Sequence, residues 1–187
     1  FVSQSIEKAK KLLPDYVEYL KKELQQTGEI ARALGLRLET VYFGGGTPTT
    51  LSAEQLSGLI AVIDKAFDLS AVREYTVEAG RPDTITPEKL SALKSGGVTR
   101  ISINPQTMND TVLERIGRRH TARQTLDAFA QARKAGMDNI NMDTIAGLPG
   151  DTAESFAETF RILTELASES ITVHTLALKR SSYLNHE

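Results

Sequence analysis

The sequence predicts an α/β fold in which parallel strands alternate with helices. Short apolar segments alternate strictly with amphipathic segments, and polar residues come late in each apolar segment or directly after it. Strict alternation is typical of parallel strands joined by right-handed crossovers. The chain has 187 residues, fewer than the roughly 250 of a complete eightfold barrel. We therefore expect a doubly wound open sheet or part of a (β/α) barrel.

The first predicted element is a helix that opens at Pro14 and Asp15 and ends at Gly35. Its apolar residues recur at helical spacing, proline favours a first helical turn, and glycine favours the end of a helix. A chain that begins with a helix, as though the strand before it were missing, favours part of a barrel. A strand over 40–43 follows and runs into the glycines at 44–46.

Ser52 and Gln55 have the residue types and the spacing of a capping box, which opens the next helix. The later elements repeat the alternation: a strand over 75–79, a helix from Thr86 to Gly96, a strand over 100–103, a short helix over 110–116, a helix from Thr121 to Gly136, a strand over 140–145, a helix over 152–166 and a strand over 171–176. We find no internal repeat or linker, so we expect one domain over residues 1–187.

Composition excludes several classes of function. The formal net charge of −2 gives no field that would hold nucleic acid or an anionic membrane. No apolar run approaches the roughly 20 residues of a membrane span, and the first residues lack the features of a secretion signal. There is no cysteine, which excludes a disulfide framework, a thiolate nucleophile and a thiolate-held iron–sulfur cluster within these residues.

The glycines at 44–46 come directly after a strand and precede Thr47. Three glycines in this place expose backbone N–H and C=O groups to a ligand. The segment lacks the Gly-Lys-Ser/Thr ending of a phosphate loop and the spaced glycines of a dinucleotide fingerprint. A plain tight turn is the alternative.

Two carboxylates lie in otherwise apolar strands. Glu78 must reach solvent or find hydrogen-bond donors, because an unpaired buried charge is costly. It could accept from the two hydroxyls of a ribose, and a salt bridge to Arg81 or Lys89 is the alternative. Asp143 favours a functional role, because a charged group is uncommon in a central parallel strand unless it points to the end where ligands bind.

The remaining candidates are polar residues that follow strands. Gln106 carries an amide that both donates and accepts, and Arg118 suits the two-pronged recognition of a carboxylate. A solvated basic turn is the alternative for Arg118, and Lys179 could bind an anion. These groups suit a polar, zwitterionic, sugar-bearing ligand. No Ser-His-Asp order and no metal-ligand pair accompanies them.

Taken together, these motifs resemble the radical S-adenosylmethionine (SAM) enzymes, and among them the oxygen-independent coproporphyrinogen III oxidase or coproporphyrinogen dehydrogenase group. The resemblance rests on five motifs in the family's order: YFGGGTPT at 42–49, TVE at 76–78, SINPQT at 102–107, NMDTIAGLPG at 141–150 and HTLA at 174–177. It covers nearly the whole chain.

The resemblance implies a partial (β/α)₆ barrel from which the first strand is missing. The family's Cys-x-x-x-Cys-x-x-Cys motif, which holds a [4Fe–4S] cluster, would then lie just before Phe1. The strand over 40–43 would form an unpaired edge, which favours self-association. The chain would lack every ligand of the cluster, so by itself it would be inactive and would carry no catalytic residue.

The resemblance also assigns residues to the binding of SAM: Gly45, Gly46 and Thr47 to the methionine end, Glu78 to the ribose, Gln106 to the nucleoside, Arg118 to the methionine carboxylate, Asp143 to the ribose or sulfonium and Ala177 to the adenine. The segment from Glu78 to Pro82 reads EAGRP where relatives carry Glu-x-Asp-Pro, which leaves the role of Arg81 open.

The function implied is that of a cytoplasmic oxidoreductase of haem biosynthesis. The parent enzyme would oxidatively decarboxylate coproporphyrinogen III to protoporphyrinogen IX, with a porphyrinogen substrate, a reductant protein as partner and no nucleic acid or membrane. Another radical SAM reaction or a haem-handling role is the alternative within the superfamily. A cysteine-free module that binds a nucleoside or haem without chemistry is the alternative outside it.

Overall fold

A computed structural model describes residues 6–177, with side chains from residue 11 onward. Its elements in chain order are α1 (Ile6–Ala33), β1 (Thr40–Phe43), the 3₁₀ turn η1 (Pro48–Thr50), α2 (Ala53–Ala66), β2 (Glu74–Gly80), the 3₁₀ turn η2 (Pro82–Thr84), α3 (Pro87–Ser95), β3 (Arg100–Gln106), α4 (Asp110–Arg115), α5 (Ala122–Lys134), β4 (Ile140–Ala146), α6 (Ala153–Glu165) and β5 (Ser170–Thr175). The candidate anion ligand Lys179 lies outside the described residues.

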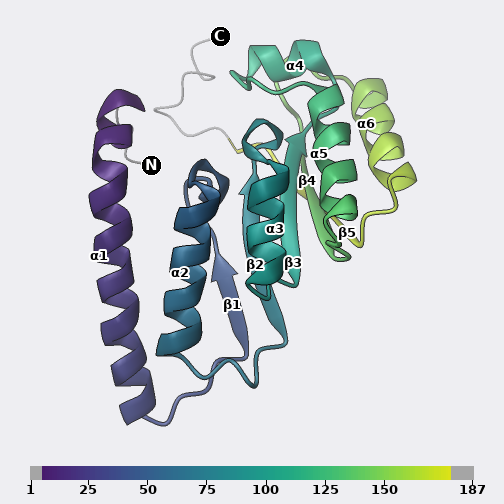
Figure 1. Cartoon of the computed structure of the whole chain (residues 1–187). Coiled ribbons are helices and arrows are strands. Elements are labelled where there is room, and N and C mark those ends of the chain that lie inside the picture. The colour runs from purple at the N-terminus through teal and green to yellow at the C-terminus, as the bar shows by residue number, and fades with distance from the viewer. Residues whose placement is uncertain (1–5, 178–187) are drawn as a thin grey trace.

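The five strands form one sheet in the order β1-β2-β3-β4-β5, and each neighbouring pair is parallel. A doubly wound sheet reverses its strand order at a switch point, whereas this order follows the chain without reversal. The helices that connect the strands lie on one side of the sheet (Figure 1). The architecture is therefore part of a barrel, which decides between the two predicted alternatives. Within the described residues, β1 is an edge strand that pairs only with β2, as predicted.

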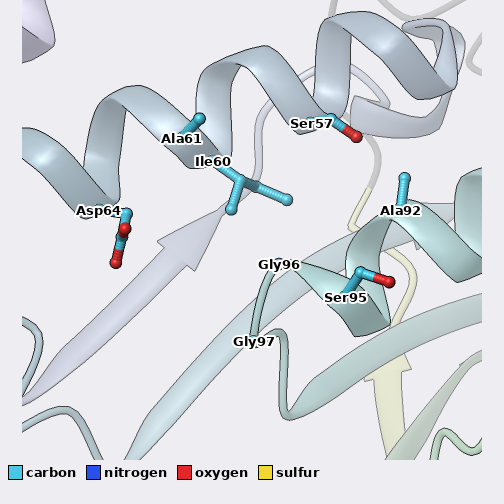
Figure 2. Close-up of a pocket in the computed structure, with 8 residues that line it drawn as sticks. All are labelled: Ser57, Ile60, Ala61, Asp64, Ala92, Ser95, Gly96 and Gly97. Atoms are coloured by element: carbon cyan, nitrogen blue, oxygen red, sulfur yellow. The ribbon is translucent and has the colours of Figure 1, made fainter.

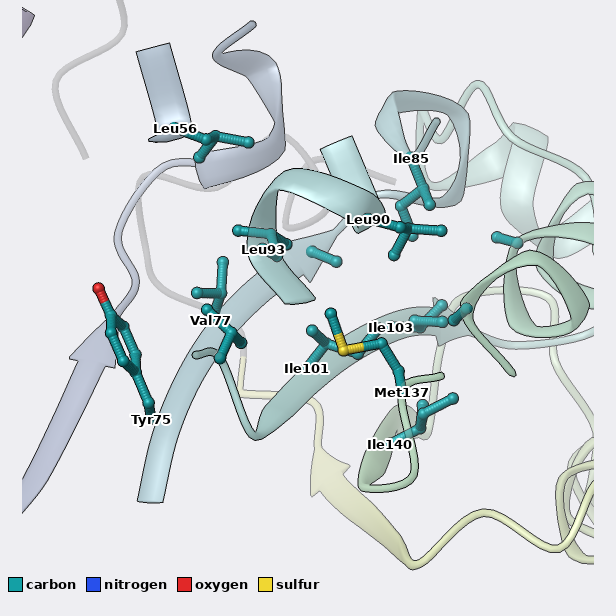
Figure 3. Close-up of a cluster of buried hydrophobic side chains, with 14 of the residues drawn as sticks. Leu56, Tyr75, Val77, Ile85, Leu90, Leu93, Ile101, Ile103, Met137 and Ile140 are labelled. Atoms are coloured by element: carbon teal, nitrogen blue, oxygen red, sulfur yellow. The ribbon is translucent and has the colours of Figure 1, made fainter. Parts of the chain in front are cut away.

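The hydrophobic core lies between the sheet and these helices. Val77, Ile101, Ile103 and Ile140 point from the strands into this layer and have no exposed surface. Leucines of α2 and α3 pack against them, as the side chains labelled in Figure 3 show. We call this side of the sheet the outer face, and the side without helices the inner face.

Helix starts follow the predicted caps. The Ser52 hydroxyl accepts from the Gln55 N–H at 3.1 Å, and the Gln55 side chain accepts from the Ser52 N–H at 2.9 Å. Thr86, Thr121 and Thr152 cap α3, α5 and α6 in a similar way. These bonds satisfy backbone donors that a helix start would otherwise leave unpaired.

The predicted start of the first helix was wrong. The helix α1 begins at Ile6 and continues through Pro14 to Ala33. Pro14 lies on the exposed side of α1, where water can satisfy the carbonyl whose intrahelical donor the proline lacks. The predicted end was right, because α1 stops two residues before Gly35. Neither α1 nor any other described helix is both long and apolar enough to cross a bilayer.

Candidate functional site

The inner face of the sheet is polar. Because side chains alternate along a strand, the residues between the core positions share this second face. The strand register places the following residues there: Tyr42 of β1; Glu74, Thr76 and Glu78 of β2; Arg100 and Ser102 of β3; Asn141, Asp143 and Ile145 of β4; and Ser170, Thr172 and His174 of β5. One sheet therefore carries an aliphatic outer face and a hydrogen-bonding inner face.

The glycine loop after β1 opens onto the carboxyl edge of the sheet. Gly45 has φ +110°, a conformation that side chains disfavour, and a Cβ at Gly45 or Gly46 would meet no atom within 4 Å. The loop is anchored to the end of β2, because the Thr49 hydroxyl donates to the Ala79 carbonyl at 2.7 Å. The backbone of Gly45 and Gly46 is thus held in place while the space around it is open.

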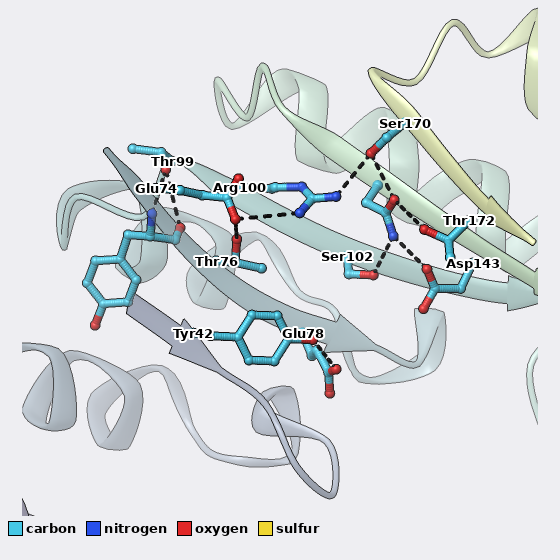
Figure 4. A network of polar contacts seen from close by, with 12 residues as sticks. Tyr42, Glu74, Thr76, Glu78, Thr99, Arg100, Ser102, Asp143, Ser170 and Thr172 are labelled. Atoms are coloured by element: carbon cyan, nitrogen blue, oxygen red, sulfur yellow. Dashed lines mark hydrogen bonds and ion pairs between the residues drawn. The ribbon is translucent and has the colours of Figure 1, made fainter. Parts of the chain in front are cut away.

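Glu78 lies on the inner face near the end of β2, with its carboxylate hydrogen-bonded to the Tyr42 hydroxyl (Figure 4). The alternative of a salt bridge to Lys89 is wrong. The Lys89 ammonium instead donates to the carbonyls of Thr49 at 2.6 Å and Thr84 at 3.0 Å. It therefore joins the 3₁₀ turns η1 and η2.

A hydrogen-bond network centred on Asn141 positions Asp143. The Asn141 amide donates to Asp143 Oδ1 at 2.6 Å and to Ser102 Oγ at 3.2 Å. Its oxygen accepts from Ser170 at 2.8 Å and from Thr172 at 3.0 Å (Figure 4). All four hydrogen-bonding positions of the buried amide are used, which fixes it in one orientation. The other Asp143 oxygen, Oδ2, lies 3.8 Å from His174 Nε2.

Gln106 is the last residue of β3 rather than a residue beyond it. Its φ of +68° is uncommon for a residue other than glycine, and the register of β3 against β4 shifts between Ile103 and Gln106. The Thr144 hydroxyl donates to the Gln106 carbonyl at 2.8 Å and so stabilises this backbone. Strained residues and strand bulges concentrate at functional sites.

Arg118 lies in the loop after α4 and is partly buried. Burial lowers the pKa of its guanidinium, the positive charge of Arg81 lowers it further, and Asp83 opposes both. These charges place Arg118 beside the loop that follows β2. The guanidinium remains charged, because arginine does not deprotonate in proteins.

His120 holds the loop that carries Arg118 against the end of β3. Its Nε2 lies 3.1 Å from the Pro105 carbonyl and must donate to it, since a carbonyl oxygen only accepts. Burial lowers the pKa of His120, the bond to Pro105 opposes that change, and Arg118 adds to it. A neutral His120 therefore ties the Arg118 loop to the end of β3.

The last predicted site residue, Ala177, is exposed two residues beyond β5. The Leu176 N–H donates to the Ala146 carbonyl at 3.0 Å, which holds this segment along the end of β4. The predicted residues Gly45, Gly46, Thr47 and Ala177 lie in segments that follow strands, and Gln106 ends β3. Glu78 lies two residues before the end of β2, and Asp143 lies in the middle of β4. Arg118 lies in a loop that His120 ties to the end of β3.

A groove on the helix-covered side offers a contrast to this edge. It has a volume of about 480 Å³ between α2 and α3 and is lined by Ser57, Ile60, Ala61, Asp64, Ala92, Ser95, Gly96 and Gly97 (Figure 2). Asp64 is the only ionisable side chain in this lining, and the rest are small or apolar. We regard it as the seam between two packed helices.

Sequence reasoning missed the polar residues deeper in the strands, above all Tyr42, Arg100, Ser102 and Asn141. The signal was present as period-two alternation, in which polar residues occupy every second position of the segments beginning at Glu74, Arg100 and Ser170. The prediction treated those segments as apolar strands that end in single polar residues, and so it missed this alternation.

Comparisons with known proteins agree with this geometry. The sequence model of the Radical SAM superfamily matches residues 6–163. The oxygen-independent coproporphyrinogen-III oxidase-like protein HemZ of Bacillus subtilis is 46% identical over 161 residues, 86% of this chain and 32% of HemZ. The haem chaperone HemW of the same species is 37% identical over 166 residues, 88% of this chain and 43% of HemW.

Among solved structures, coproporphyrinogen III oxidase (HemN) of Escherichia coli, a radical SAM enzyme, superposes with a TM-score of 0.77 at 29% identity. The match covers 95% of this chain and 39% of HemN. The sheet therefore has the partial-barrel architecture of this neighbour. The chain therefore spans less than half of the length of these relatives.

Proposed function

The chain belongs to the radical SAM superfamily, and we propose that it is the core barrel of an enzyme that oxidatively decarboxylates coproporphyrinogen III to protoporphyrinogen IX. The relative named as a coproporphyrinogen-III oxidase-like protein supports this choice of reaction, since it is 46% identical to this chain. We further propose that residues 1–187 act as one domain, because one continuous sheet joins the described strands.

One arrangement carries the proposal: an open glycine backbone follows β1, Glu78 and Asp143 lie on the inner face of β2 and β4, and His120 ties the Arg118 loop to the end of β3. Ligands of such folds bind at the carboxyl edge of the sheet. In the proposal, Gly45, Gly46 and Thr47 hold the amino end of SAM. Arg118 binds its carboxylate by a charge-assisted pair.

The nucleoside half of SAM would extend across the other strands of the same edge. Glu78 accepts from the ribose hydroxyls, Asp143 faces the ribose or the sulfonium, and Gln106 contacts the nucleoside. Ala177 packs against the adenine. The Asn141 network supports the role of Asp143, because it holds that carboxylate in one orientation before ligand arrives.

The superfamily implies a [4Fe–4S] cluster as well as SAM, and the residues of this chain do not fit the cluster. The 187 residues include no cysteine. The described part of the chain also contains no group of three histidine, aspartate or glutamate residues that could hold a metal ion. The function that we assign to these residues is therefore to bind and orient SAM.

A haem-handling role is the second candidate, and the 37% identity to the haem chaperone HemW favours it. Haem iron needs an axial ligand such as histidine. Among the described residues, His174 is exposed on the inner face, whereas His120 is buried and bonded to Pro105. Titration with haemin, followed at the Soret band in the chain and in His174→Ala, distinguishes this role from SAM binding.

Calorimetric titration with SAM tests the first proposal. We expect the chain to bind SAM, and we expect Glu78→Gln and Arg118→Ala each to weaken binding about tenfold, the usual effect of losing one hydrogen bond to a charged group. Asp64→Asn, in the groove between α2 and α3, is the matched control and leaves affinity unchanged. Equal affinities for all four proteins would refute the assignment of the site.

A further inference from the structure

We propose that Tyr42 is a positioning residue, which fixes the Glu78 carboxylate so that its free oxygen faces the ribose of the bound ligand. This inference rests on the proposed function, because it takes Glu78 as the ribose acceptor. It goes further by naming a residue on a different strand on which that recognition depends.

The hydrogen bond between Tyr42 and Glu78 joins β1 to β2 across the inner face (Figure 4). The Tyr42 hydroxyl donates to Oε1 of Glu78. Within the described part of the chain, the hydrogen bond to Glu78 is made at Oε1, so this oxygen is held and Oε2 is left for a ligand. A carboxylate held at one oxygen has lost rotational freedom before ligand arrives, which lowers the entropic cost of binding.

The absence of a side chain at Gly44 leaves room for the Tyr42–Glu78 pair. A Cβ built on Gly44 would overlap the edge of the Tyr42 ring, and it would lie 3.1 Å from Tyr42 Cδ1 and 3.3 Å from Glu78 Cδ. The ring therefore reaches Glu78 by passing directly over the Gly44 backbone. The first glycine of the loop makes room for a protein side chain, whereas Gly45 and Gly46 leave open space.

A purely structural role does not account for Tyr42. Its side chain is 63% exposed, so it contributes little buried apolar area to the core. Its hydroxyl is protonated at neutral pH and can donate, because desolvation, followed by the bond to Glu78 and the charges of Glu78 and Asp143, raises the pKa of Tyr42 to about 12. Tyr42 is exposed, and its hydrogen bond holds the acceptor that we assign to the ribose.

The test compares adenosine with 2′,3′-dideoxyadenosine, which lacks the diol that Glu78 would recognise. Both affinities are measured by NMR titration of the ¹⁵N-labelled chain and of the variants Tyr42→Phe, Glu78→Gln and their double substitution. We expect the chain to prefer adenosine by about tenfold, and Tyr42→Phe to reduce this preference to about threefold, the range expected for one hydrogen bond. Glu78→Gln abolishes the preference, and adding Tyr42→Phe to it changes nothing more.

Gly44→Ala is a second way to break the hydrogen bond between Tyr42 and Glu78. The new methyl group moves the Tyr42 ring away from Glu78, so it should lower the preference as Tyr42→Phe does. In a Tyr42→Ala background its effect should be smaller, because the overlap with the ring is gone and only the 3.3 Å approach to Glu78 Cδ remains.

A full preference for adenosine in Tyr42→Phe would overturn the inference, as would an additive effect in the double variant. Failure of the unsubstituted chain to bind the nucleosides and SAM alike would overturn the proposed function itself. Equal binding of both nucleosides by that chain would overturn only the ribose role of Glu78 and Tyr42.

Discussion

The two faces of this sheet are made by alternate residues of the same strands, yet they follow opposite rules. On the outer face, Ile103 and Met142 have no exposed surface and meet helices. On the inner face, Ser102 and Asp143, each next to one of those residues in sequence, use their polar atoms in the Asn141 network. The outer face excludes water, and the inner face replaces water with fixed hydrogen bonds.

This difference separates stability from function within a single strand. A parallel strand that is covered on both faces is usually apolar throughout, because both faces are buried. Among the described elements, helices cover one face of the sheet (Figure 1), and the other face carries acids, amides and hydroxyls. Substitutions of buried outer-face residues should therefore change folding, whereas substitutions of the inner-face groups that face the ligand should change ligand binding.

The largest expected effect comes from Ile103→Ala on the outer face. Removing this fully buried side chain leaves a cavity and should lower the free energy of unfolding by about 3 kcal/mol. The matched control is Ile145→Ala, the same chemical change at a half-buried position of the inner face, which should cost about 1 kcal/mol. Urea unfolding measures both, and equal losses would contradict the division between the faces.

An intermediate effect is expected from Asn141→Ala at the centre of the inner-face network. Four hydrogen bonds are lost, but three of their partners, Asp143, Ser170 and Thr172, are only half-buried and can bond to water. The cost should therefore be about 2 kcal/mol. SAM affinity should fall as well, because Asp143 loses its support. Thr172→Val removes one of these bonds, and it should cost about 1 kcal/mol with unchanged affinity. If Asn141→Ala lost stability but kept its affinity for SAM, the network would contribute to folding only, which would contradict its role in positioning Asp143.

The sequence was sufficient for most of the fold, because helix caps and strand alternation are local signals. Ser52, Thr86 and Thr121 marked helix starts through side chains that bond within three residues. Pro14 misled the prediction, because whether proline ends a helix depends on whether its freed carbonyl faces water, and that is set by how α1 packs.

The candidate site was only partly predictable. Glu78 and Asp143 each stand out as a charged residue next to apolar residues in the sequence, so the local pattern was sufficient to select them as candidates. The Tyr42–Glu78 bond joins residues 36 positions apart, and the support of Arg118 by His120 depends on a loop geometry that no local pattern encodes. The positive φ of Gln106 likewise depends on a register shift between β3 and β4.

The smallest expected effect is a difference between two tyrosines on opposite faces. Burial raises the pKa of Tyr75, on the outer face, to about 12. The pKa of Tyr42 is also raised to about 12, first by desolvation and then by its hydrogen bond to Glu78 and the charge of Glu78. A pKa raised above its unfolded value of about 10 means that stability is complete below pH 10 and falls as pH rises toward 12. Glu78→Gln should lower the pKa of Tyr42 and leave that of Tyr75 unchanged.

An NMR pH titration of the tyrosine ¹³Cζ resonances measures the pKa of each residue separately. The resonance that is missing in Tyr75→Phe is assigned to Tyr75. A common shift of both tyrosines in Glu78→Gln would show that Glu78 acts through the whole fold and not through its hydrogen bond.

The central claim is that the carboxyl edge of the inner face binds an adenosyl amino acid, and an amide chemical-shift map of the ¹⁵N-labelled chain titrated with SAM tests it most directly. The account predicts that the shifts concentrate at Gly45, Gly46, Gln106 and the residues around Asp143, while Gly58 of α2 and Gly96 after α3 stay in place. Shifts centred on the groove between α2 and α3, or none at saturating SAM, would contradict it.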